Sequence, residues 1–183
     1  MTHPAQAALL LVDIVDSAAL AQRLGDSEMA AFRTAHDRQA RDLVRQWGGR
    51  EIDKTDGFLL MFSHAADALG CALAYHRALS ELDEPISARA GIHVGPVTLR
   101  ENDSADVALG AKPLELDGLA KPIVARVMAT ALGGQTLLTQ TATLLGSGFR
   151  VDSIGRQPKP EGTHERHVRQ PREHRVGKRP CAL

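Results

Sequence analysis

Aromatic residues and cysteines are scarce in this sequence, and both shortages narrow what the chain can be. Its 183 residues include only four Phe, one Trp and one Tyr. The core must therefore be aliphatic, and a surface that stacks nucleic-acid bases is hard to assemble. Cys71 and Cys181 lack metal-binding spacing, which favours a reducing compartment. No run reaches the ~20 apolar residues of a membrane span, and no basic segment of a signal peptide precedes the first apolar run. We therefore expect a cytoplasmic protein.

Charge is unevenly distributed, although the formal net charge is zero. Residues 1–155 contain 14 Lys/Arg and 19 Asp/Glu, whereas residues 156–183 contain 8 and 3. The first segment is long enough for one domain with its own core. The second has almost no apolar residues at any period, which predicts a disordered basic tail. A solvated extension is favoured there over a tail that binds nucleic acid or acidic lipid.

The apolar periodicity predicts an α+β fold. Strand patterns and helix patterns alternate in the order β-α-β-β-α-β, which indicates a ferredoxin-like core with helices on one face of a mostly antiparallel sheet. The expected elements are a strand at 8–15, helix from there to 47 with a break near 25, two strands within 50–62, a helix at 64–82, a strand at 86–99, a polar loop at 101–113, a helix at 117–131, a strand at 135–139, a helix at 140–146 and a strand at 149–154.

Two acidic residues suggest a metal site. Asp13 interrupts the apolar run LLLVDIV, where an ionised carboxylate costs several kcal/mol unless a cation or hydrogen bonds compensate it. Asp56 occupies the turn of the predicted hairpin REIDKTDGFLLMF. A right-handed crossover followed by a hairpin brings that turn back beside the end of the first strand, so we expect the two carboxylates to converge. Asp13 could alternatively cap the following helix. That helix begins near Asp16 and Ser17, and its free N–H groups would favour a phosphate.

Four segments, in order, resemble class III nucleotidyl cyclase domains. DIVDSAALAQRLGD is similar to the opening motif of that family, KTDGFLLMF to its metal-binding hairpin, RAGIHVGPV to its R-GIH-GEV strand and GLAKPIVARVMATALGGQTLLT to its G-AVN-AARL helix and following strand. Together they cover roughly residues 8–146. The resemblance implies a cytoplasmic signalling domain that converts ATP to cyclic AMP and pyrophosphate, with GTP as the less favoured substrate. It also implies a homodimer with active sites at the interface.

The resemblance assigns roles to particular residues. Asp13 and Asp56 match the two acids that hold paired Mg²⁺ or Mn²⁺ ions. Ile14, with Val15, Asp16 and Ser17, matches the segment that meets the phosphates. Arg126 matches the arginine that stabilises charge on the α-phosphoryl group across the dimer, a task that suits a planar guanidinium.

Other positions depart from the family pattern. The family's adenine-binding lysine lies four residues before the second acid, where this chain has Ile52. Lys54 lies two before it and could either recognise the base from the same face of the strand or pair with a carboxylate. Pro122 replaces an asparagine and removes its hydrogen bonds. Glu115 and Asp117 are the two candidates for the polar group that recognises the purine amino group.

Asp16 replaces a glycine in the phosphate segment. Its carboxylate would repel a triphosphate, so we interpret it as a cap of the following helix.

These departures from the family pattern leave two functions open. One is a metal-dependent adenylate cyclase; the other is a catalytically weak or inactive cyclase-homology domain that binds nucleotide as a regulatory or dimerisation module. Acids at both metal positions favour the enzyme.

Overall fold

The computed structural model describes residues 5–55, 57–82, 86–145, 152–153 and 165–168. The sheet strands are β1 (Ala5–Ile14), β2 (Arg50–Lys54), β3 (Phe58–Phe62), β4 (Ala88–Glu101), β5 (Leu114–Asp117), β6 (Thr136–Thr139), β7 (Asp152–Ser153) and β8 (Glu165–Val168). The helices are α1 (Ser17–Leu24), α2 (Asp26–Gln46), α3 (Ala65–Ser80), α4 (Ser104–Ala108), α5 (Ala120–Thr130) and α6 (Gln140–Leu145). The order β1-α1/α2-β2-β3-α3-β4 confirms the predicted βαββαβ core.

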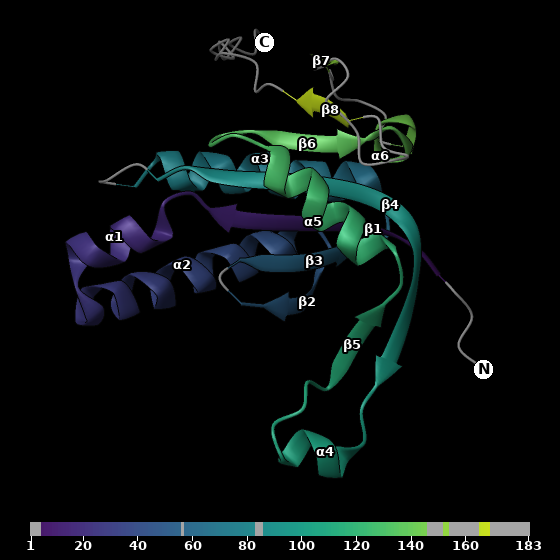
Figure 1. Cartoon of the computed structure of the whole chain (residues 1–183), viewed down its shortest axis with the longest axis horizontal. Coiled ribbons are helices and arrows are strands. Elements are labelled where there is room, and N and C mark those ends of the chain that lie inside the picture. Colours follow the sequence, from purple (N-terminus) through teal and green to yellow (C-terminus); the bar gives the residue numbers. More distant parts are fainter. Residues whose placement is uncertain (1–4, 56, 83–85, 146–151, 154–164, 169–183) are drawn as a thin grey trace, which may run out of the picture.

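One sheet organises the fold, with the strand order β2-β3-β1-β4-β6-β8-β7 and β5 paired to β4 (Figure 1). β1 lies at its centre and pairs antiparallel with both β3 and β4. β2 also runs antiparallel to β3, so β1 and β2 point the same way and the β2–β3 turn returns to the end of β1. This is the arrangement that the crossover argument predicts.

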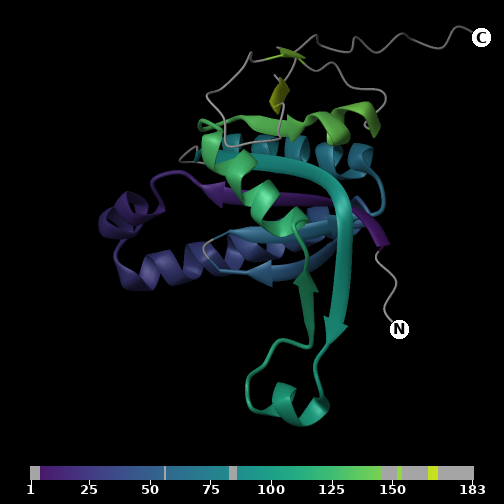
Figure 2. The ribbon, with the colours of Figure 1, turned by 45° about the vertical axis from the view of Figure 1, so that its right-hand side comes forward.

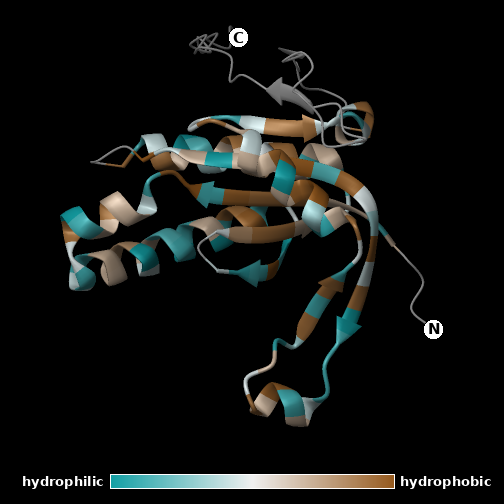
Figure 3. Ribbon diagram, viewed as in Figure 1, coloured by the Kyte–Doolittle hydropathy of each residue, from teal (hydrophilic) through white to brown (hydrophobic). Residues whose placement is uncertain are grey.

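The side chains of alternate residues of β1 are buried on opposite faces of the sheet. Leu10 and Val12 belong to the larger core cluster, which also contains residues of α2 and α3. Leu9 packs in a second cluster with Val124 of α5. The two core helices thus cover one face, as predicted, whereas α5, which follows the core in the chain, crosses the other face (Figure 1). Hydrophobic residues are concentrated along β1 and β6 between these layers (Figure 3).

β4 and β5 form an arm that projects from the body of the domain, with α4 at its tip (Figure 2). The predicted polar loop at residues 101–113 is therefore partly wrong, because it contains α4 and leads into β5. The Asp103 carboxylate accepts a hydrogen bond from the Ala105 N–H at 2.8 Å and so caps α4. The helix predicted at 117–131 begins later, at Ala120, because residues 114–117 are taken by β5.

The sheet also continues past the predicted end of the domain at residue 155. β8, at residues 165–168, pairs antiparallel with β6 and with β7. A tail beginning at residue 156 is therefore wrong for this stretch, because an added edge strand is held by backbone hydrogen bonds and needs no apolar periodicity. The rest of the predicted tail lies outside the described residues.

Candidate active site

Asp13 is the last residue but one of β1, and its charge is compensated by an arginine. Asp13 lies directly opposite Arg89 of β4 in the strand register. Both the Nη2 and the Nε group of Arg89 donate to Asp13 Oδ2, at 2.7 and 3.1 Å. The Asp13 side chain is only 18% exposed. The structure thus supplies the cation that an acid in an apolar strand requires, from a residue not singled out from the sequence.

The turn between β2 and β3 packs against this end of β1. A methyl group added to Gly57 would lie 2.0 Å from the carbonyl oxygen of Val12 and 3.3 Å from Asp13 Cα. The hairpin backbone next to position 56 is therefore in contact with the backbone of Asp13. Asp56 itself lies outside the described residues, so the convergence of the two carboxylates stays a prediction.

The segment after β1 leads into α1 through a left-handed residue. Asp16 has φ 56° and ψ 33°, and its side chain makes no capping hydrogen bond. Its interpretation as a side-chain cap is therefore wrong: Asp16 occupies the N-cap position through its backbone, with its carbonyl accepting from Leu20 N at 3.0 Å. Glycine adopts this conformation without strain.

The backbone N–H groups of this segment are not all free for a phosphate. The Val15 N–H donates to the Ser87 carbonyl at 2.9 Å, and Ile14 is buried. Ser17 begins α1 and is among the first residues of that helix, whose N–H groups lack intrahelical acceptors. Of the four residues assigned to phosphate binding, Ser17 therefore has the most suitable backbone.

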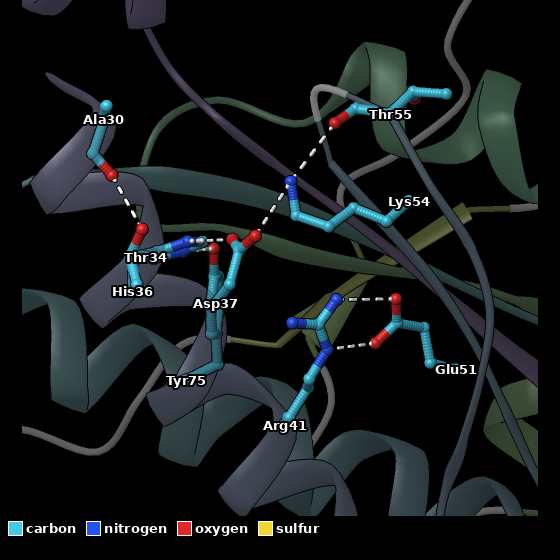
Figure 4. Close-up of polar contacts among 9 residues, drawn as sticks. All are labelled: Ala30, Thr34, His36, Asp37, Arg41, Glu51, Lys54, Thr55 and Tyr75. Carbon is cyan, nitrogen blue, oxygen red and sulfur yellow. Dashed lines mark hydrogen bonds and ion pairs between the residues drawn. The ribbon is translucent and has the colours of Figure 1, made fainter.

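Lys54 lies on the face of the sheet that α2 covers. A bulge between Glu51 and Asp53 makes Ile52 an extra residue in β2. Because of it, Lys54 pairs with Phe58, whose side chain belongs to the core cluster of α2 and α3. Lys54 Nζ lies 3.2 Å from Asp37 Oδ2 (Figure 4). It also lies 5.2 Å from the centre of the Phe58 ring. Of the two roles considered for Lys54, the structure shows pairing with a carboxylate.

Asp37 also joins a polar cluster between α2 and α3. His36 Nδ1 lies 3.1 Å from Asp37 Oδ1, and His36 Nε2 lies 2.7 Å from the hydroxyl of Tyr75 (Figure 4). Burial lowers the pKa of His36 despite its hydrogen bond to Asp37. A neutral imidazole can donate at one nitrogen and accept at the other, which satisfies both contacts. His36 therefore joins the two helices and takes no part at the rim near Asp13.

The opposite face contains a small cavity of about 190 Å³ beside the hairpin turn, with Asp53, Thr55 and Lys121 as its polar lining residues. Lys121 Nζ lies 3.6 Å from Asp53 Oδ2, and Lys112 also forms an ion pair with Asp53. Burial acts to raise the pKa of Asp53, but the hydrogen bond and charge of Lys112, together with Lys121, outweigh it and lower that pKa. Through these two ion pairs, Asp53 links α5 and the loop before β5 to the hairpin.

Glu115 and Asp117 lie on the β4–β5 arm. Arg100, opposite Glu115 in the register, forms ion pairs with both acids. Asn102 donates a further hydrogen bond to Glu115 at 3.1 Å. Within one chain, these acids are engaged by residues of the arm itself.

Arg126 is exposed on α5, whereas the neighbouring Val127 is buried toward the sheet. Pro122 lies in the first turn, where the first helical hydrogen bond runs from Ile123 N to the Leu119 carbonyl at 3.2 Å. Proline therefore removes no hydrogen bond from α5, and the loss at that position is confined to the side chain.

Comparison with solved structures gives the same architecture in several cyclases. The adenylyl cyclase CyaB from P. aeruginosa matches with a TM-score of 0.81 and 13% identity, over 97% of this chain and 100% of that chain. The guanylate cyclase domain of RhGC from Catenaria anguillulae, in complex with GTP, matches with a TM-score of 0.80 and 18% identity, over 90% and 97%. Adenylate cyclases from Trypanosoma brucei, in their monomeric state, match with a TM-score of 0.78 and 20% identity, over 89% of each chain. The chain has the class III cyclase fold.

Sequence comparison adds one relative. The uncharacterized protein Rv1359 of Mycobacterium tuberculosis is 35% identical over 125 residues, which are 66% of this chain and 44% of that protein. The chain thus spans less than half the length of this relative. No protein-family model matches the chain. None of the helices in the described residues is long and apolar enough to cross a membrane.

The cyclase fold implies divalent cations, and the rim around Asp13 fits one by its chemistry. Its carboxylate is a hard oxygen donor, the type that Mg²⁺ and Mn²⁺ prefer, and in the structure it is neutralised by Arg89. Among the described residues, no three His, Cys, Asp or Glu side chains gather into a metal site. A second carboxylate would have to come from position 56, whose neighbour Gly57 contacts this rim.

Proposed function

We propose that this chain is an adenylate cyclase-like domain, which converts ATP to cyclic AMP and pyrophosphate with two Mg²⁺ or Mn²⁺ ions at a homodimer interface. The observation that supports it best is the contact between the β2–β3 turn and the end of β1, where Asp13 lies. This contact brings the segment that carries Asp56 to the same rim. The cyclase fold supplies the context in which such a rim would bind a nucleotide.

Asp13 and Asp56 would hold the ions. Bound there, the ions would lower the pKa of the ribose 3′-hydroxyl and neutralise the triphosphate. The first N–H groups of α1, beginning at Ser17, would orient a phosphate. Exposed Arg126 would place its guanidinium against the α-phosphoryl group bound by the partner subunit.

Complementation between two variants tests the dimeric arrangement. Asp56→Ala and Arg126→Ala should each lose cyclic AMP formation from ATP with Mn²⁺. In a mixed dimer, one site combines both defects and the other has neither, because each site takes its acids and its arginine from different subunits. Random exchange of subunits should therefore restore about a quarter of the wild-type rate. GTP assayed in parallel tests the preference for ATP.

No cyclic product from a dimer confirmed by light scattering would exclude the enzyme. If Asp56→Ala forms the product at the wild-type rate, the proposed metal site is excluded but the cyclase activity is not. If neither mixing nor the single variants affect the rate, catalysis does not use Arg126 across an interface.

A nucleotide-binding module without turnover is the second candidate. It is favoured by the pairing of Lys54 with Asp37 and of Glu115 with Arg100, because both pairings engage groups expected to recognise the base. This candidate predicts ATP binding by calorimetry without cyclic product. Mixing the Asp56→Ala and Arg126→Ala variants would then restore no cyclic AMP formation.

A further inference from the structure

The contact between Arg89 and Asp13 is fixed by the strand register. The two residues are directly opposite in the antiparallel pairing of β1 and β4. Two N–H groups of Arg89 converge on a single oxygen, Asp13 Oδ2. A pair in register, with a largely buried carboxylate, holds its geometry better than a surface ion pair between flexible side chains.

Both side chains lie on the sheet face that α5 crosses. Asp13 follows Leu9 and Leu11, which pack on the α5 side, at two-residue spacing. Arg89 precedes Gly91 at the same spacing, and a methyl group on Gly91 would lie 2.5 Å from Met128 N of α5. Arg89 therefore lies beyond the C-terminal part of α5, on the β4 side of Asp13, whereas the β2–β3 hairpin lies on the β3 side.

A divalent cation and this guanidinium would compete for the same oxygen. A cation ligated by Oδ2 would lie about 2.1 Å from it, while Arg89 Nη2 lies 2.7 Å from it. Two positive groups would then be within about 5 Å of each other in a partly buried site, where screening by solvent is weak. Ligation at Oδ2 with Arg89 in place is therefore opposed by this repulsion, which favours withdrawal of the guanidinium.

We propose that Arg89 is an exchangeable counter-ion of Asp13, which competes with the divalent cation and thereby sets the metal affinity of the site. This inference rests on the proposed function only in taking Asp13 as a metal ligand. In the metal-free protein, Arg89 neutralises the carboxylate and holds the Asp13 side chain against β4. Metal binding releases the guanidinium, so the occupancy of Asp13 by metal and by Arg89 is mutually exclusive.

Mn²⁺ binding tests this without an activity assay. The bound fraction is measured from the loss of the electron paramagnetic resonance signal of free Mn²⁺. Arg89→Met should bind Mn²⁺ about fivefold more tightly than wild type, the gain expected from removing a partly exposed competing pair. The gain should persist in 0.5 M KCl, where the Debye length is about 4 Å and long-range effects of the lost charge are screened.

Arg100→Met is the matched control. Arg100 lies on the same strand and pairs across to Glu115, so its loss removes the same charge and a similar contact far along the arm. It should leave Mn²⁺ affinity unchanged. Arg89→Lys, which keeps the charge but not the two-pronged contact, should fall between wild type and Arg89→Met, and it serves as the readout if Arg89→Met does not fold.

Unchanged or weaker Mn²⁺ binding by Arg89→Met would overturn the inference. Weaker binding is the result expected if Arg89 instead orients Asp13 for the metal. Asp13→Asn separates this failure from failure of the proposed site. If Asp13→Asn binds Mn²⁺ as well as wild type, Asp13 is no ligand and the metal site itself is wrong. If Asp13→Asn abolishes binding but Arg89→Met does not alter it, only the role of Arg89 is wrong.

Discussion

Gly57 lies against the carbonyl group of Val12 so closely that no other residue fits, since any Cβ there would be 2.0 Å from that oxygen. The close approach links the hairpin to the end of β1, one residue before Asp13. Gly57→Ala should therefore push the turn away from β1. We expect a loss of at least 2 kcal/mol in the free energy of unfolding, typical of steric overlap in a packed region.

Urea unfolding checks the stability of Gly57→Ala, and Mn²⁺ binding checks its effect at the rim. Gly133→Ala is a suitable control, because its added methyl group would meet side-chain atoms and no backbone: Ser87 Cβ at 3.1 Å and Val15 Cγ2 at 3.6 Å. Equal stability of wild type and Gly57→Ala would show that the hairpin can shift without cost.

The pairing of Lys54 with Asp37 gives a second prediction. Lys54→Met should leave ATP affinity within about twofold of wild type, because Lys54 Nζ lies on the α2 face, opposite Asp13. The substitution should lower the free energy of unfolding by less than about 1 kcal/mol, as for other partly exposed ion pairs. Calorimetric titration with ATP measures the first and urea unfolding the second. A tenfold loss of ATP affinity would instead support recognition of the base by Lys54.

Much of the fold follows from local patterns in the sequence. The alternation in β1, the helical spacing before Trp47 and the turn residues at 53–57 are each determined by nearby residues, and the right-handed crossover joins them into one core. The rim that holds Asp13 could be predicted for the same reason. By contrast, neither the length of β4 nor the β5 strand has a strong local signal, because β5 has only four residues and the far end of β4 is polar and exposed.

The site is less predictable because its contacts depend on strand register. The bulge at Ile52 breaks the two-residue alternation of β2, so that Lys54 pairs with Phe58 on the face that α2 covers, which counting along an ideal strand does not anticipate. Arg89 begins the RAGIHVGPV segment, so a signal for it was present in the sequence. Its role could be found only once β1 and β4 were aligned and Asp13 lay opposite.

The left-handed conformation of Asp16 gives a third prediction. Asp16→Gly should raise the free energy of unfolding by about 0.5–1 kcal/mol, because glycine relieves the strain of a positive φ and no side-chain cap is lost. Asp16→Ala should lower it by a similar amount, since alanine tolerates the left-handed region less well than aspartate. Thermal unfolding of the three proteins at one pH measures both differences. A destabilised glycine variant would indicate that the carboxylate does stabilise the start of α1.

Stability should also depend on the charge state of His76. Its side chain is buried between α3 and β6, where Nε2 lies 3.0 Å from the hydroxyl of Thr136. Burial lowers the pKa of His76 to about 4, from an ordinary value of 6.5. Below pH 6.5 the unfolded chain therefore binds a proton that the folded protein excludes. The free energy of unfolding should fall by about 3 kcal/mol from this residue as the pH drops from 6.5 to 4.

His76→Gln tests this assignment, because glutamine can keep a hydrogen bond to Thr136 but does not titrate. Urea unfolding from pH 7 to 4.5 should show a shallower fall in stability for His76→Gln than for wild type. A residual slope is expected in the variant, since burial also lowers the pKa values of His36 and His93. Parallel curves for His76→Gln and wild type would mean that His76 accepts a proton within the fold, and that its contact with Thr136 does not require the neutral ring.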